Sequence, residues 1–530
     1  MKYRLENDTY EIDAEERQNF RIEQNYILGI IGTPFIGKEK LTYEDIIKII
    51  QNNSMEKVAG QYCIIFINRK QRKVILYRDP TGLQKIYFSL NNVYEIEIKK
   101  SLRLFNLTDI KINHEYVIDY LNSNIYRNCS TGYINIYRAI PGYKIDIDKN
   151  SFTVKRYYKF INNPIRYKDR IEYMEHFNYL FEQAIIRNLE DVENLSVSLS
   201  GGLDSSSIYS VIQNKELYNK KVNTYSLYYP DDIDSNEIEY IKSVLKEYPS
   251  SNHTLIDATS DWTFKNFELY YKNFIEPYHL IGPNLNTMLL KPMHADNITH
   301  HITGHAGDHV LNGDYYYLNY LYKNKYYKKL SLEYIKLSKE FSSFELKQAI
   351  KNDVKDIKET YFWKKDSLNL EKNFNWDPYE MNRYFDEIIS HSGHEWIDIN
   401  INENWNIENR YPFLDINLIE FLLNIPVNEK WNAYSTKVIL RESLKDILPF
   451  NIYSRKTKAT NLSQLLKGLQ IEKGRILSHK RFSNLNKIIN INAKLFEEEV
   501  NLLSNSLKDS YYNVINVSKV LSIELWLKNK

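Results

Sequence analysis

The N-terminal part of the chain alternates hydrophobic and polar residues with the two-residue period of β-strands. The runs that show this alternation most clearly are residues 62–67, 73–77, 85–88 and 143–148. One stretch, residues 41–52, has helical spacing instead, and Thr42 is placed to cap it. Residues 1–160 are therefore predicted to form an antiparallel, β-rich domain.

The pattern changes after a segment around residues 155–170 that loses the strand period. Residues 171–189 have the apolar spacing of an amphipathic helix. Short apolar strands are predicted beyond it at residues 195–199, 222–228, 253–256 and 300–303. Strands that alternate with helix-length segments predict a parallel, doubly wound sheet, and the chain is helix-rich from about residue 330. The second domain is predicted to span residues 168–530.

Composition narrows the class of protein. A chain of 530 residues is too long for one core. Lys and Arg number 70 against 68 Asp and Glu, which argues against a nucleic-acid binder held by a basic field. Cys63 and Cys129 have no metal-type spacing and cannot build a disulfide framework. The N-terminal residues are polar and lack the apolar core of a signal peptide, and no uninterrupted apolar run is long enough for a bilayer. We expect a cytoplasmic protein without membrane or nucleic-acid partners.

The stretch Leu195–Ser207 organises the second domain. It reads Leu-Ser-Val-Ser-Leu-Ser-Gly-Gly-Leu-Asp-Ser-Ser-Ser, a short strand that turns at two glycines into a helix-compatible segment. Glycines let the backbone approach a ligand, and free N–H groups at such a turn form an anion site. Asp204 places a carboxylate where a phosphate-bound Mg²⁺ would sit. The predicted nucleotide-binding residues here are Ser198, Ser200, Gly201, Gly202, Leu203, Asp204, Ser205 and Ser206.

The sequence Ser-Gly-Gly-Leu-Asp-Ser-Ser resembles the pyrophosphate loop of adenylating ATP pyrophosphatases, and it lacks the Lys-Ser/Thr ending of a Walker A loop. Residues 303–313 resemble the Ser-Gly-Glu-Gly-Ser-Asp-Glu-x-x-x-Gly motif of asparagine synthetases. The resemblance implies that Gly304 lies in the nucleotide site and that Asp308 is the second Mg²⁺ carboxylate. His305 stands where asparagine synthetases have glutamate and β-lactam synthetases have tyrosine. An imidazole there can take a proton from an incoming ammonium, or it can merely shape the loop.

Residues 408–415 (Glu-Asn-Arg-Tyr-Pro-Phe-Leu-Asp) resemble the family's Glu-Ala-Arg-Val-Pro-Phe-Leu-Asp, which implies a place for Glu408 in the catalytic site. Residues 436–459 resemble the family's Lys-x-x-Leu-Arg … Leu-Pro … Arg-x-x-Lys block. Its last lysine contacts the α-phosphate in the family. The resemblance gives this catalytic role to Lys458, with Lys456 as the alternative. A cation contributes most to catalysis at the place where an oxyanion develops.

The N-terminal domain resembles the glutaminase domain of asparagine synthetases, through residues 59–62 (Ala-Gly-Gln-Tyr) and 78–87 (Arg-Asp-Pro-Thr-Gly-Leu-Gln-Lys-Ile-Tyr). Active members carry cysteine as the second residue, and this chain carries Lys2. Cys63 and Cys129 cannot replace it, because the mechanism needs the chain's own α-amino group beside the thiol. The Asn-Gly-Glu-Ile-Tyr-Asn segment that holds glutamine is also missing. Glutamine hydrolysis is not expected.

The resemblance implies an α/β protein with two parts. One is an inactive Ntn-type glutaminase-like domain. The other is an adenine-nucleotide α-hydrolase-like (PP-loop) synthetase domain with a helical C-terminal part. The implied enzyme is an AMP-forming carbon–nitrogen ligase that uses ATP and Mg²⁺. Without a glutaminase, the amine must come from elsewhere.

Within the family, the resemblance favours the lasso peptide macrolactam synthetase (cyclase) branch of RiPP and antibiotic biosynthesis. Its substrate is a precursor peptide, and its partners are a leader-binding protein and a leader protease. The alternatives are β-lactam-synthetase-like or other small-molecule amide synthesis, an ammonia-dependent asparagine synthetase, and a binding protein that kept the fold.

Overall fold

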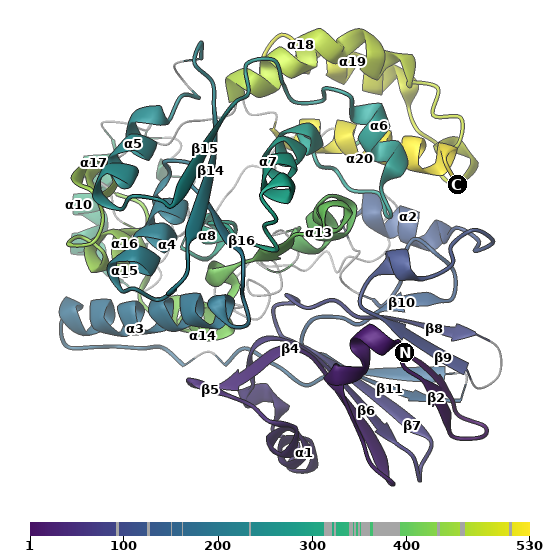
Figure 1. The fold of residues 1–530 in the computed structure, drawn as a ribbon. Coiled ribbons are helices and arrows are strands. Elements are labelled where there is room, and N and C mark those ends of the chain that lie inside the picture. The colour runs from purple at the N-terminus through teal and green to yellow at the C-terminus, as the bar shows by residue number, and fades with distance from the viewer. Residues whose placement is uncertain are drawn as a thin grey trace.

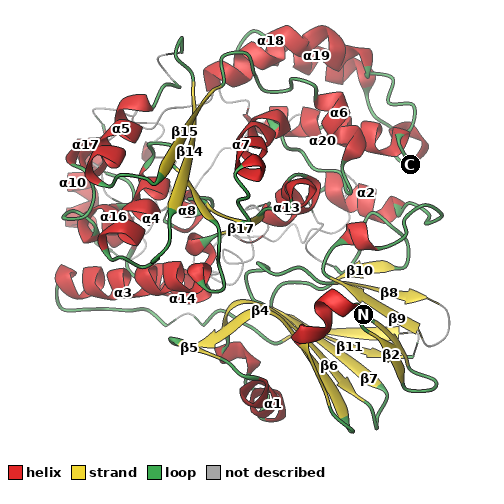
Figure 2. Cartoon of the chain, in the orientation of Figure 1, coloured by secondary structure: helices red, strands yellow, loops and turns green. Residues whose placement is uncertain are grey.

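The computed structural model describes residues 1–91, 95–123, 128–149, 151–161, 163–232, 235–311, 318, 321–322, 325–338, 343, 346–347, 350, 361–363, 389, 393–431, 435–455, 462–507 and 511–530. Figure 1 shows a β-rich part built from the N-terminal residues, drawn in purple and blue, and a larger part of mixed strands and helices beside it. The strands of the β-rich part run side by side, whereas helices surround the strands of the larger part (Figure 2).

The N-terminal part contains two antiparallel sheets. Its strands are β1 (Lys2–Arg4), β2 (Thr9–Glu11), β3 (Phe20–Ile22), β4 (Tyr26–Ile36), β5 (Glu39–Lys40), β6 (Ala59–Asn68), β7 (Lys73–Arg78), β8 (Tyr87–Asn91), β9 (Glu95–Lys99), β10 (Ile136–Arg138), β11 (Tyr143–Asp148) and β12 (Ser151–Arg156). One sheet has the order β10-β8-β9-β1-β2, and the other β12-β11-β7-β6-β4-β3, with β5 paired to β4. The predicted strands and their antiparallel pairing are confirmed.

Alternation along the strands follows from burial. Ile96 and Ile98 of β9 face Ile145 and Ile147 of β11 across a core between the two sheets. The outer face of the second sheet is covered by α1 (Tyr43–Gln51), whose Ile46 packs in a second core. Thr42 caps α1 through a capping box, so the predicted helix and its start are confirmed. The helix α2 (His114–Leu121) completes this part.

The second part is built on a parallel sheet of β13 (Leu195–Ser198), β14 (Val222–Tyr228), β15 (Asn252–Asp257), β16 (His300–Ile302) and β17 (Glu408–Arg410). Its order is β15-β14-β13-β16-β17, and every neighbouring pair is parallel. The predicted parallel sheet is confirmed, and β17 is a strand that the pattern did not predict. The order reverses direction between β13 and β16, which is where such sheets bind ligands.

Helices flank this sheet and continue to the end of the chain. They are α3 (Arg170–Leu189), α4 (Leu203–Asn214), α5 (Ile238–Glu247), α6 (Phe267–Asn273), α7 (Pro283–Ala295), α8 (Gly307–Val310), α10 (Tyr327–Leu337), α13 (His394–Asn400), α14 (Ile416–Asn424), α15 (Val427–Lys430), α16 (Val438–Ser443), α17 (Phe450–Ser454), α18 (Leu462–Ser478), α19 (Ala493–Leu503) and α20 (Tyr511–Lys528). Across the described ranges, no helix combines the length and the apolar character that crossing a membrane requires.

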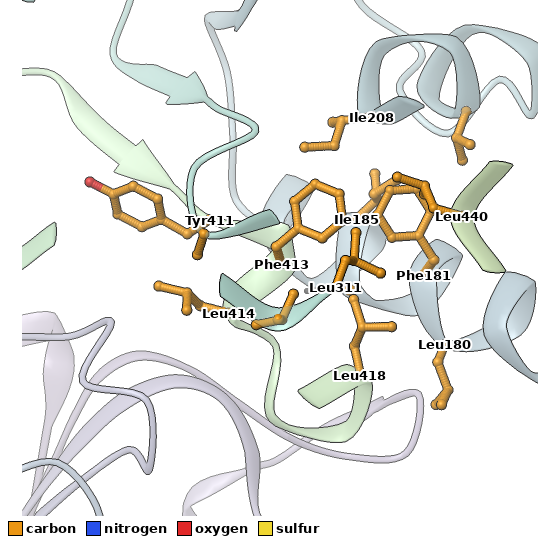
Figure 3. Close-up of a cluster of buried hydrophobic side chains, with 14 of the residues drawn as sticks. Leu180, Phe181, Ile185, Ile208, Leu311, Tyr411, Phe413, Leu414, Leu418 and Leu440 are labelled. Carbon is orange, nitrogen blue, oxygen red and sulfur yellow. The ribbon is translucent and has the colours of Figure 1, made fainter. Parts of the chain in front are cut away.

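The core of the second part packs α3 against α4 and against the segment that follows β17. The buried face of α3, including Phe181 and Ile185, packs with Ile208 of α4 and with Phe413 and Leu418 beyond β17 (Figure 3). The apolar face predicted for α3 is therefore the one that the structure buries. This packing fixes the start of α4, and with it the loop that follows β13.

Candidate active site

The loop after β13 has the geometry of an anion site. Gly201 has a φ of +73°, and a Cβ there would lie 3.0 Å from the Cβ of Tyr240, so a side chain is excluded both by conformation and by space. The backbone N–H of Ser200 donates to Ser205 Oγ (3.2 Å), and that of Gly202 donates to Ser200 Oγ (3.3 Å). α4 begins at Leu203, so the helix N-terminus points its N–H groups into this loop.

The second predicted loop, after β16, packs directly against the first turn of α4. A Cβ on Gly304 would lie 2.7 Å from the backbone nitrogen of Ser205, and one on Gly307 would lie 2.6 Å from Cγ of Asp204. Both glycines are therefore required for the close approach of the two loops. The consequence is that Asp308, which follows Gly307, shares one location with Asp204.

Asp204 and Asp308 converge on a single cation, the ammonium of Lys437. Its Nζ lies 2.7 and 2.5 Å from the two carboxylate oxygens of Asp204 and 2.6 Å from Oδ1 of Asp308. Asp204 and Lys437 are almost fully buried, whereas the side chain of Asp308 is 59% exposed. Lys437 is the N-cap of α16 and has a φ of +54°, a conformation that few non-glycine residues adopt.

This arrangement fits a divalent cation. Two carboxylates that reach one ammonium also reach one metal ion, and hard oxygen ligands are what Mg²⁺ prefers. Within the part of the chain that the structure describes, no group of three or more His, Cys, Asp or Glu side chains could hold a metal ion. Mg²⁺ commonly uses one or two protein carboxylates and completes its shell with phosphates and water. Asp204 and Asp308 would hold such an ion.

Ser198, at the end of β13, contacts a buried histidine. Each ring nitrogen of His301 forms a hydrogen bond with a serine hydroxyl, Nδ1 with Ser196 Oγ (2.7 Å) and Nε2 with Ser198 Oγ (2.6 Å). Burial lowers the pKa of His301 to about 4, so the ring is neutral at physiological pH. The neighbouring His300 lies on the other face of the strand beside Glu408, as expected for adjacent strand residues. The two histidines do not face a common ligand.

His305 lies on the same loop as Asp308 and faces an aromatic ring. Its backbone N–H donates to Thr303 Oγ1 (2.9 Å), and its ring centroid lies 5.6 Å from that of Tyr411 and 6.5 Å from that of His309. The side chain is half-buried. His305 directly follows Gly304, which packs against Asp204 and Ser205 at the start of α4, so it is in a position to meet a molecule bound there.

Glu408 lies at the other end of the sheet. It pairs in register with His300, which pairs with Leu195, the first residue of β13. The loop after β13, hereafter the phosphate loop, instead follows the last residue of that strand, Ser198. Its carboxylate contacts Arg410 (3.0 Å) and lies 3.9 Å from His300 Nε2. The structure does not bring Glu408 to the phosphate loop. Tyr411 follows the carboxyl end of the same strand and does face the loop of His305.

Arg455, which precedes the predicted oxyanion lysine in the sequence, contacts the loop after β13. Lys458 and Lys456 lie outside the described residues, but Arg455 is described. Its guanidinium forms an ion pair with Glu237, donates to the carbonyl of Gly201 (3.2 Å) and lies 3.9 Å from the ring centroid of Tyr240. Arg455 therefore joins the end of α17 to the loop and to the start of α5.

The sequence motifs predicted no role for Lys437, although it lies in the segment that resembles the Lys-x-x-Leu-Arg block. Its partner Asp204 is 233 residues away, so only the fold brings the two together. The signal available was the lysine that opens the Lys-x-x-Leu-Arg block. No role was predicted for Tyr411 either, because the family motif Glu-Ala-Arg-Val-Pro-Phe-Leu-Asp has valine at that position.

The N-terminal part has no accessible thiol among its described residues. Burial raises the pKa of Cys129 to about 12 and that of Cys63 well above its usual value. Lys2, at the position where active glutaminases carry cysteine, lies in β1, whose backbone pairs with β2 and β9.

Comparison with known proteins places the second part. The family model described as Asparagine synthase matches residues 176–528, more than half of the chain. The chain belongs to the asparagine synthase family. The match begins in α3 and includes β13, both glycine-containing loops and Lys437.

Two curated relatives come from Bacillus subtilis (strain 168). Asparagine synthetase [glutamine-hydrolyzing] 1 is 26% identical over 30% of this chain and 26% of its own length. Asparagine synthetase [glutamine-hydrolyzing] 2 is 21% identical over 74% of this chain and 54% of its own length. This member of the asparagine synthase family therefore spans about half, or less, of the relatives that it matches.

Two solved structures resemble the chain only weakly. The glutamine phosphoribosylpyrophosphate (PRPP) amidotransferase from B. subtilis, complexed with ADP and GMP, is 11% identical with a TM-score of 0.20, and the match covers 47% of this chain and 75% of that one. The allosteric regulatory enzyme of purine biosynthesis is also 11% identical, with a TM-score of 0.18, over 45% of this chain and 62% of the other. Likenesses of this size carry no argument about function.

Proposed function

We propose that this protein is an ATP-dependent amide-forming ligase that closes a macrolactam ring in a ribosomally made (lasso-type) precursor peptide. A side-chain carboxylate of the peptide attacks the α-phosphorus of ATP, and pyrophosphate leaves. The peptide's N-terminal amine then attacks the acyl carbon, AMP leaves, and the proton of the amine passes to a base. The carrying observation is the convergence of Asp204, Asp308 and Lys437 beside the phosphate loop.

The side chains divide the work by charge. The N–H groups at the start of α4 suit the phosphates of ATP. Asp204 and Asp308 would hold Mg²⁺, which supplies charge neutralisation to the departing pyrophosphate when bound. Lys437 contributes a positive charge at the same point and would turn from the carboxylates to the phosphates. His305 is the base that this site offers for the proton of the attacking amine.

The state of the N-terminal part supports an amine that belongs to the substrate. Both cysteines are buried with raised thiol pKa values, and Lys2 stands at the nucleophile position. An enzyme without its own ammonia source gains most from a substrate that carries both the carboxylate and the amine, because holding the two together removes most of the entropic barrier to their reaction. We propose a leader-binding protein and a leader protease as partners that deliver the peptide.

The test is AMP and pyrophosphate release with mass spectrometry of the product. The full-length enzyme receives Mg·ATP with a leaderless peptide that bears an internal Asp or Glu, or with aspartate and ammonia. We expect AMP together with a peptide that has lost one water. Formation of asparagine from aspartate and ammonia would contradict the macrolactam proposal. AMP release only with a small amino acid would indicate β-lactam-type ring closure instead.

A further inference from the structure

Tyr411 is held by two residues, Asp398 and Asn188, each of which also contacts a residue of the N-terminal part. Its hydroxyl donates to Oδ1 of Asp398 (2.8 Å), and Lys85 Nζ lies 3.2 Å from the other oxygen of that carboxylate. Its backbone N–H donates to Asn188 Oδ1 (3.1 Å), and Gln61 Nε2 donates to the same oxygen (3.2 Å). Gln61 and Lys85 both belong to the segments that resemble a glutaminase domain.

The ring of Tyr411 lies between two histidines. The ring centroid of His305, on the loop after β16, lies 5.6 Å from that of Tyr411. The ring centroid of His394, on α13, lies 5.5 Å from it. His394 Nε2 donates to the backbone carbonyl of Gly82 (3.0 Å), which again belongs to the N-terminal part. Figure 3 shows the hydroxyl of Tyr411 directed away from the apolar cluster that its neighbours Phe413 and Leu414 enter.

The chemistry of this network is that of a fixed support. Burial first, and then the charge of Asp398, raise the pKa of Tyr411 well above its usual value, so its hydroxyl stays protonated and donates. Asn409 Nδ2 donates to the same hydroxyl (3.0 Å), which therefore has partners for both roles. A tyrosine in this state cannot act as a base. Its effect on the reaction is to fix the ring against which His305 packs.

We propose that Lys85 and Gln61 are positioning residues, through which the N-terminal part sets the orientation of Tyr411 and thereby of His305. The domain that resembles a glutaminase would then serve the synthetase site as a support. Its catalytic consequence rests on the proposed function above, whereas its structural content does not, because it concerns contacts that exist without substrate.

The test compares Lys85→Met with the matched control Lys40→Met. Lys40 also joins the two parts of the molecule, through Glu190 (3.2 Å) and Asp191 (2.6 Å), but this pair is exposed and does not reach Tyr411. Lys85→Arg is the rescue variant. Tyr411→Phe keeps the ring and removes only the hydroxyl, so it decides the matter if Lys85→Met does not fold. All are made in the full-length chain, and thermal unfolding establishes that each is folded.

The first readout is the NMR chemical shift of the His305 ring in protein with isotope-labelled histidine. The signal is assigned by its loss in His305→Gln. We expect it to shift in Lys85→Met and Tyr411→Phe, to stay in place in Lys40→Met, and to return in Lys85→Arg. The second is AMP release, where we expect kcat to fall about tenfold or more with KM for ATP unchanged, because misplaced groups lose rate rather than affinity.

An unmoved His305 resonance in both Lys85→Met and Tyr411→Phe would overturn the proposal. So would a wild-type kcat in both variants when the parent enzyme is active. If the parent releases no AMP with any substrate, the proposed function fails, and the resonance alone decides whether the N-terminal part positions His305.

Discussion

Charged residues are buried in several regions of the described structure, and two of these regions use them differently. Where the N-terminal part meets α13, Arg78 and Arg138 both contact Glu395 (2.9 Å each), and Arg138 also pairs with Glu276. These side chains are at most 1% exposed, and each charge has its opposite within the chain. At the phosphate loop, the carboxylates of Asp204 and Asp308 meet Lys437, and the side chain of Asp308 is 59% exposed.

The difference gives the buried arginines of the N-terminal part a structural role. Arg78 belongs to the segment that resembles a glutaminase, and it donates to the carbonyls of Gly82 (2.8 Å) and Ala139 (2.8 Å) as well as to Glu395. Removing it would leave buried acceptors unpaired. A charge that is neutralised inside the chain joins two domains, whereas charges that converge beside an exposed carboxylate are available to a ligand.

The largest effect is expected at the second region. Asp204→Asn should lower AMP release by at least about 1,000-fold, because it removes one of two carboxylates for the divalent cation and leaves Lys437 without its buried partner. The measurement is AMP formation under saturating Mg·ATP with the substrate that the parent enzyme accepts.

The control for this variant is Asp257→Asn. Asp257 ends β15 at the same edge of the sheet, but it is exposed and its side chain accepts from the N–H of Thr259 (2.8 Å). We expect its activity to match the parent. An Asp204→Asn enzyme that retains full activity would remove the distinction between the two regions.

A smaller effect, on stability instead of activity, is expected at the first region. Burial alone would raise the pKa of Glu395, but Arg78 and Arg138 hold it at about 2. Glu395→Gln keeps the shape and leaves two buried guanidinium groups without their shared anion. Breaking such a pair from one side costs about 3–5 kcal/mol of unfolding free energy. Chemical denaturation of the full-length protein measures it.

The exposed ion pair of Lys40 with Asp191 gives the comparison for that measurement. Lys40→Met should change the unfolding free energy by less than about 1 kcal/mol, because solvent screens both charges. Equal losses in Glu395→Gln and Lys40→Met would show that the buried network adds nothing to the joint between the domains.

Sequence reasoning predicted the elements that depend on local pattern. Strands such as β7 and β11 bury alternate residues, and α3 buries one face, so their periods are visible in the chain. β17 was not predicted, because three polar residues, Glu-Asn-Arg, have no hydrophobic period and become a strand only by pairing with β16. The helix-compatible segment after the two glycines is α4, which begins at Leu203, directly after Gly202.

The site divides in the same way. The glycines and Asp204 are contiguous, so their arrangement follows from the turn itself, and the loop of Asp308 follows from a second motif. Lys437 and Tyr411 acquire their contacts from partners far along the chain, which no local pattern contains. Glu408 illustrates the limit, because the strand register, invisible in the sequence, decides which end of the sheet it occupies.

The smallest effect compares one buried histidine from each region. Burial lowers the pKa of His301, beside the phosphate loop, to about 4, and the pKa of His394, at the joint with Gly82, to about 4 as well, from an ordinary 6.5. As pH falls from about 6.5 to about 4, the unfolded chain binds protons that the folded chain does not. The unfolding free energy must therefore fall over that window, by at most about 1.4 kcal/mol per pH unit for each ring. His301→Gln and His394→Gln should each flatten the pH dependence of stability. A slope that persists undiminished in both buried variants would mean that neither ring is kept neutral by the fold, and the two regions would then not share this response to acid.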